Sequence, residues 1–76
     1  MNKTIVKFKN PDDIRNFVKT VEKYPFNMDM KSGNDIVDAK SILGLMTLGL
    51  NKKIELKVYE DNCGDLLRDI QPYVAA

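Results

Sequence analysis

Histidine and tryptophan are both absent from this sequence of 76 residues. Without an imidazole, the chain lacks the side chain that most often acts as a general base, and it has no histidine to carry phosphate or bind zinc. The single cysteine, Cys63, has no partner for an internal disulfide, which fits a reducing compartment. Because one cysteine and scattered carboxylates do not make a zinc site, we predict neither a metal nor a cofactor.

The sequence also has little net charge and no long apolar run. Twelve basic and eleven acidic residues give a formal net charge of +1, and they are scattered along the chain. The missing basic block argues against direct binding of nucleic acid, and the missing apolar run argues against a membrane protein. A chain of 76 residues has room for one modest core. We therefore expect a single cytoplasmic domain over residues 1–76.

Hydrophobic patterning predicts alternating strands and helices. Period-two alternation predicts strands at 4–9, 26–31, 36–38 and 53–59, with a turn at 32–35. Helical spacing predicts helices from Pro11, after the cap Asn10, to about Pro25, from about 41 to 48 before Gly49, and from about 62. The candidate core residues of the outer helices are Ile14, Phe17, Val18, Val21, Cys63, Leu66, Leu67, Ile70 and Val74. We expect Cys63 to be a buried, inert thiol, and Pro72 to distort the last turn.

The order of these elements predicts a fold class. It reads strand, helix, strand, strand, short helix, strand, helix. Helices with one apolar face need a sheet to cover, so we predict an α+β fold with two layers, an open-faced sandwich.

The run Asp-Ala-Lys-Ser-Ile-Leu-Gly-Leu-Met-Thr-Leu-Gly-Leu, residues 38–50, resembles the regulatory-serine segment of the HPr proteins. These are small phosphocarriers of the bacterial sugar phosphotransferase system. The resemblance implies an antiparallel four-stranded sheet with three helices on one face. We do not expect an enzyme, because the sequence contains no catalytic pair and no plausible nucleophile.

HPr proteins carry the pattern Gly-x-His-x-Arg-Pro-Ala, in which the histidine accepts phosphate. Aligned with this pattern, the phosphohistidine position falls on Asn10 and the active-site arginine position on Asp12. An amide is not basic enough to accept phosphate reversibly, and Asp12 and Asp13 place negative charge where phosphate would lie. We therefore predict no catalytic residue here. The alternative interpretation of Asn10 to Asp13 is a well-capped helix start and nothing more.

The resemblance assigns Ser41 to the serine that a dedicated ATP-dependent kinase phosphorylates in many Gram-positive HPr proteins. Ser41 begins a short helix beside Lys40, where a phosphate would meet unpaired backbone N–H groups. The alternative is that Ser41 only caps the helix.

By the same resemblance, Ile42, Leu43 and Met46 form the patch that docks partner proteins. Ile42, Leu45 and Met46 are expected on one face of the short helix, with Leu43, Leu48 and Leu50 on the other. A helix that has one solvent-exposed face cannot bury this many apolar residues. The alternative is that they are core, as we expect for Leu45, Leu48 and Leu50.

The first helix offers Arg15, Asn16 and Lys19 where relatives present a polar, basic rim to the same partners. A solvated helix face explains these residues equally well.

The leading hypothesis is an HPr-like regulatory module that binds proteins of the phosphotransferase system or a LacI-type catabolite repressor, with HPr kinase acting on Ser41. The alternative is a domain that keeps only the fold, for structural or interaction purposes. A homodimer, formed through the short apolar helix or through exchange of the first strand, is a third hypothesis.

Overall fold

The structure is a computed structural model that describes residues 1–75. Within these residues the elements are β1 (Asn2–Val6), α1 (Pro11–Val21), β2 (Met28–Ser32), β3 (Asp35–Asp38), α2 (Ile42–Leu48), β4 (Ile54–Val58) and α3 (Gly64–Asp69), followed by a 3₁₀ turn at Gln71–Tyr73. The predicted order of strands and helices is confirmed.

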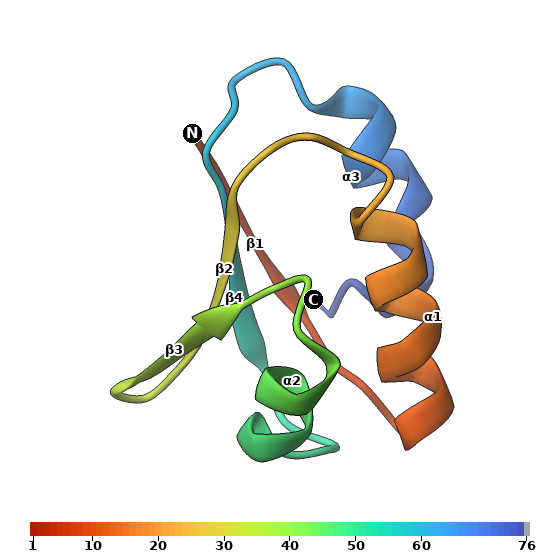
Figure 1. Ribbon diagram of the computed structural model, residues 1–76, viewed down its shortest axis with the longest axis vertical. Coiled ribbons are helices and arrows are strands. Elements are labelled where there is room, and N and C mark those ends of the chain that lie inside the picture. Colours follow the sequence, from red (N-terminus) through yellow and green to blue (C-terminus); the bar gives the residue numbers. More distant parts are fainter. Residues whose placement is uncertain (76) are drawn as a thin grey trace.

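The strands of residues 1–75 form one sheet in the order β1-β4-β2-β3, and every neighbouring pair is antiparallel. The helices lie on one side of this sheet, and no element covers its other side in Figure 1. The predicted α+β open-faced sandwich is therefore confirmed.

Helix α1 forms as its sequence predicts. Asn10 has extended backbone angles and caps the helix, Pro11 opens it, and the apolar stripe at helical spacing is buried. The helix ends at Val21 rather than near Pro25. Its end is tightened by the hydrogen bond from Tyr24 N–H to the Val21 carbonyl, at 3.1 Å, which spans three residues instead of four.

Strand β1 begins two residues earlier and ends three residues earlier than predicted, and β2 begins two residues later than predicted. Val6 pairs with Ile54 as the last residue of β1, and the chain then leaves β4. Lys7 N–H donates instead to the Tyr73 carbonyl at 2.9 Å, so buried Phe8 lies in a connecting segment. Phe26 stacks on Tyr24 outside the sheet, with ring centroids 5.9 Å apart.

The C-terminal helix starts later and ends earlier than predicted. It begins at Gly64, and the chain changes to the 3₁₀ turn that contains Pro72. Proline has no N–H to donate, so the distortion predicted there is confirmed. Leu67 and Val74 are only partly buried and pack against the core from outside it.

Candidate functional site

At the start of α1, two side chains accept hydrogen bonds from nearby backbone N–H groups. The Asn10 side-chain oxygen accepts from Asp13 N–H at 2.9 Å, and the Asp13 carboxylate accepts from Lys9 N–H at 2.9 Å. Donors of this kind would otherwise be available to an anion at a helix start. Side-chain oxygens of Asn10 and Asp13 therefore already occupy two backbone donors near this helix start.

Negative charge gathers at the same place. The Asp12 carboxylate forms an ion pair with Arg15 at 2.6 Å, and both side chains are exposed. Burial raises the pKa of Tyr73, and the nearby Asp13 carboxylate raises it further. Of the predicted rim residues, Arg15 is thus held by Asp12, whereas Lys19 is exposed in the last turn of α1.

Ser41 is the N-cap residue of α2. Its hydroxyl oxygen accepts from Gly44 N–H at 3.0 Å. The side chain of Lys40 is directed elsewhere, because its ammonium donates to the Tyr24 carbonyl at 2.7 Å. Ser41 is half-buried, and the first turn of α2 contains no acidic residue.

The apolar residues of α2 divide unequally between core and surface. Leu45 and Leu48 are buried, Met46 packs partly against the core, and Leu43 is 81% exposed beside Ile42 at 40%. The predicted division of faces is wrong for Leu48, which lies with Leu45. We call Ile42, Leu43 and Met46 the α2 patch.

The prediction that Leu50 is a core residue is also wrong, since it is 37% exposed. Helix α2 ends at Leu48, and the backbone of Gly49 has φ of 100°. The helical spacing therefore does not continue to Leu50. Asn51 N–H donates to the Phe8 carbonyl at 2.7 Å, which fixes this segment beside the approach to α1.

Gly44 allows α2 to approach β3 closely. A Cβ atom at this position would lie 2.9 Å from Val37 Cβ and 3.2 Å from Ser41 Oγ. We expect Gly44→Ala to lower the free energy of unfolding by about 1–2 kcal/mol, because crowding outweighs the better helix propensity of alanine. Urea unfolding followed by circular dichroism measures this. Gly64→Ala is the matched control, because a Cβ there meets nothing within 4 Å; equal stability of both variants would contradict the prediction.

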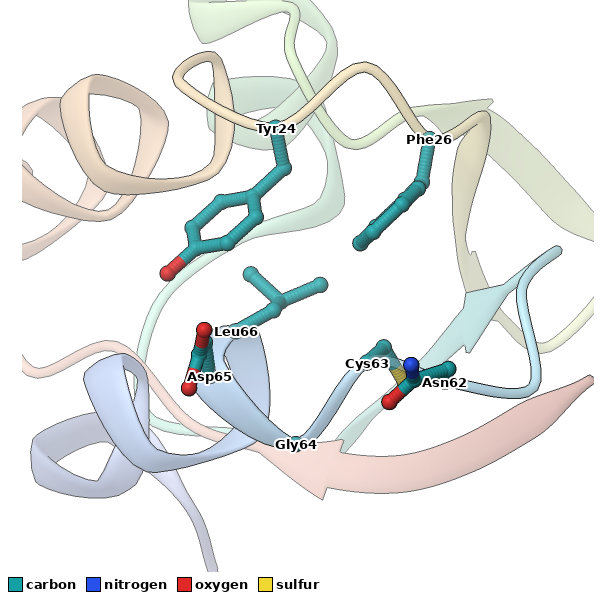
Figure 2. Close-up of a pocket in the computed structure, with 7 residues that line it drawn as sticks. All are labelled: Tyr24, Phe26, Asn62, Cys63, Gly64, Asp65 and Leu66. Atoms are coloured by element: carbon teal, nitrogen blue, oxygen red, sulfur yellow. The ribbon is translucent and has the colours of Figure 1, made fainter.

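A small hollow lies between α3 and the segment before β2. Figure 2 shows Tyr24 and Phe26 on one side of it and residues 62–66 on the other. Its volume is about 200 Å³. A hydrogen bond to Asp69 raises the pKa of Tyr24 most strongly, followed by burial. Cys63 is buried as predicted, and its sulfur accepts from the Asn2 side-chain amide at 3.1 Å.

The described part of the chain contains no cluster of three or more metal-ligating side chains. None of the helices found within residues 1–75 has the length and apolar character needed to cross a membrane.

Comparison with known proteins decides the family. The family model described as the PTS HPr component phosphorylation site matches residues 13–71, which is more than half of the chain. The chain belongs to the HPr family. The match begins at Asp13, so Asn10 and Asp12, which the resemblance aligns with the phosphohistidine and the arginine, lie outside it. A search of curated proteins found no match.

Solved structures agree with this assignment. The chain is similar to HPr-C-His from Thermoanaerobacter tengcongensis, with 25% identity, a TM-score of 0.76 and coverage of 92% of this chain and 86% of that one. It shares its fold with the phosphocarrier protein HPr from Bacillus anthracis str. Ames, with 20% identity, a TM-score of 0.75 and coverage of 97% and 96%. The HPr family consists of phosphocarriers of the phosphotransferase system, not of catalytic enzymes.

Two features of the structure were not predicted from the sequence. One is the pair of contacts from Tyr24, to Lys40 and to Asp69, which joins the segment after α1 to the turn before α2 and to the end of α3. No local pattern signals them. The other is the arrangement of charges on the uncovered sheet face. The alternation of charged residues along 53–59 and 27–31 signalled that such a face exists.

Proposed function

We propose that this HPr-family chain is a regulatory protein-binding module of the cytoplasm that does not carry phosphate on histidine. The observation that carries the proposal is the α2 patch, in which Leu43, 81% exposed, stands two residues after Ser41. Exposed apolar side chains on a rigid helix favour contact with another protein. The partners proposed are proteins of the phosphotransferase system or a catabolite repressor.

The start of α1 supports the part of this proposal that excludes phosphate transfer through histidine. Phosphoryl transfer to this position needs a nucleophilic nitrogen and donors for the phosphate oxygens. Here the sequence offers the amide of Asn10, which is occupied as a helix cap, and the exposed carboxylate of Asp12. Incubation with phosphoenolpyruvate and the phosphotransferase enzyme that normally loads HPr is therefore expected to leave the mass unchanged.

Phosphorylation of Ser41 is the proposed switch. Its oxygen already accepts from Gly44 N–H, so a phosphate on that oxygen would remain next to the helix start. Added charge at the edge of the α2 patch would change which partners bind there.

The test is incubation with ATP and purified HPr kinase, followed by intact mass and site mapping. We expect one added phosphoryl group on the protein and none on Ser41→Ala. Because the alanine variant loses a helix cap at a cost of about 1 kcal/mol, circular dichroism must show it folded. An unmodified protein, with the kinase active on another HPr, would favour the alternative of a domain that retains only the fold and binds without modification.

A further inference from the structure

The uncovered face of the sheet carries two rows of side chains that the strand register defines. The first row, read from β1 to β3, is Lys3, Lys57, Asp29 and Asp38. The second row is Ile5, Glu55, Lys31 and Ile36. Successive side chains of a strand point to opposite faces, and Val37 points to the helix side, where it approaches Gly44. Both rows therefore lie on the face that the helices leave open.

Several of these side chains line one shallow hollow of about 150 Å³. The hollow is lined by Tyr59, which follows β4, and by side chains from every strand of the sheet: Lys3, Asp29, Lys31, Ile36, Glu55 and Lys57. Ile36 is 61% exposed. Tyr59 donates to the Asp29 carboxylate at 2.8 Å and lies under the Lys57 ammonium, 5.1 Å from its ring centroid.

Within a single chain, the first row places like charges side by side at each of its ends, with one pair of opposite charges, Lys57 and Asp29, between them. Lys3 lies directly opposite Lys57, and Asp29 lies directly opposite Asp38. Like charges placed opposite one another destabilise a sheet. The ion pairs found among residues 1–75 involve none of these residues. The row is thus positive at one end and negative at the other.

We infer that this face is a symmetric interface with a second copy of the chain. Consider a copy turned over about a twofold axis that lies between the two faces, parallel to the strands and midway between β4 and β2. The rotation places β1 against the copy's β3, and β4 against the copy's β2. It leaves positions along the strand direction unchanged, so each row of side chains faces the same row of the copy. Such an isologous contact is the commonest kind in homodimers.

Both rows are complementary to themselves under this rotation. In the first row, Lys3 faces Asp38 of the other copy, and Lys57 faces Asp29. In the second row, Glu55 faces Lys31, and Ile5 faces Ile36. Every charge meets its opposite, and the apolar ends meet each other. The axis perpendicular to the strands fails this test, because it places Lys3 against Ile5 and Asp38 against Ile36.

The interface leaves the proposed binding surface free. Helix α2 lies on the helix side of the sheet (Figure 1), so a dimer built through the open face presents two α2 patches to solution. Two patches on one particle strengthen binding to a partner that has two sites, by effective concentration. The inference itself does not depend on the proposed function.

Sedimentation equilibrium of the intact chain tests the interface. At low salt and rising concentration, the mass is expected to rise from 8.7 kDa toward twice that value. In 1 M NaCl, where the screening length falls to about 3 Å, we expect dissociation. A mass that stays at one chain at low salt and millimolar concentration would overturn the inference.

Charge exchange at Lys31 and Glu55 tests the geometry. Glu55→Lys places two lysines together at each of the symmetric contacts, so dimerisation should weaken about tenfold. The double variant Lys31→Glu with Glu55→Lys should restore it. With the axis perpendicular to the strands, the double variant would instead bring the new carboxylate at position 31 against Asp29 and would dimerise more weakly still.

Leu43→Asp distinguishes the α2 patch from the open face. We expect it to leave the dimer unchanged, and circular dichroism melts confirm that each variant is folded. A dimer that Leu43→Asp breaks and Glu55→Lys does not would place the contact on α2, against this inference.

Discussion

Phe17→Ala is expected to remove most of the stability of the fold. Phe17 is fully buried on α1 and makes edge-to-face contacts with Phe8 and Tyr73, at centroid distances of 5.1 and 5.5 Å. Truncating a buried phenylalanine costs about 3–5 kcal/mol. A domain of this size has a free energy of unfolding of roughly 4–11 kcal/mol. The variant should therefore be partly unfolded at room temperature or unfold at much lower urea concentration.

Urea denaturation followed by circular dichroism measures this change. Phe17→Leu keeps the position apolar and should lose clearly less. Lys19→Ala, on the exposed face of the same helix, should stay within about 0.5 kcal/mol of the parent protein. A loss of less than about 1 kcal/mol in Phe17→Ala, well below the usual cost, would show that the contact between α1 and the C-terminal 3₁₀ turn contributes little.

Leu43→Asp is expected to reduce partner binding strongly without a comparable loss of stability. Leu43 is 81% exposed, so a carboxylate there remains hydrated when the chain is alone. In a complex, the same carboxylate would be buried against an apolar surface and would lose its hydration. Truncation of a central contact residue commonly costs about tenfold or more in affinity, and a buried charge costs more.

The readout is kcat/KM of HPr kinase on the chain, because a kinase that modifies Ser41, as we propose, would contact the adjacent α2. We expect a decrease of about tenfold or more. The matched control is Ile36→Asp, an exposed apolar residue on the opposite face, 61% exposed; it should leave kcat/KM unchanged in dilute solution. Equal decreases in both variants would argue against the α2 patch as a docking surface.

The local parts of this protein were predictable because their causes are local. Asn10 and Pro11 begin α1, and the spacing of its apolar residues selects the face that is buried. Ser41 begins α2 for the same reason, through its bond with Gly44 N–H. Element boundaries were less predictable, because nonlocal bonds set them. The end of β1 follows from the bond between Lys7 and Tyr73, which local patterning does not contain.

The candidate site was predictable in its residues but not in their exposure. Apolar side chains follow one another closely in α2 and just beyond it, and their order alone does not select which face the core takes. The approach of Gly44 to Val37 fixes the rotation of the helix. Leu45 and Leu48 are buried as a result, while Leu43 is exposed.

The sequence by itself determined the absence of histidine, the capped helices and the order of elements, because each depends on composition or on residues that are neighbours along the chain. Only the tertiary structure decided which charges share a row on the open face. Lys3 and Lys57 are far apart in the sequence, yet they lie opposite each other. Strand order and register arise from contacts between distant segments. The alternation within each strand determines on which face of the sheet a side chain lies, but not which residue of the adjacent strand lies opposite it.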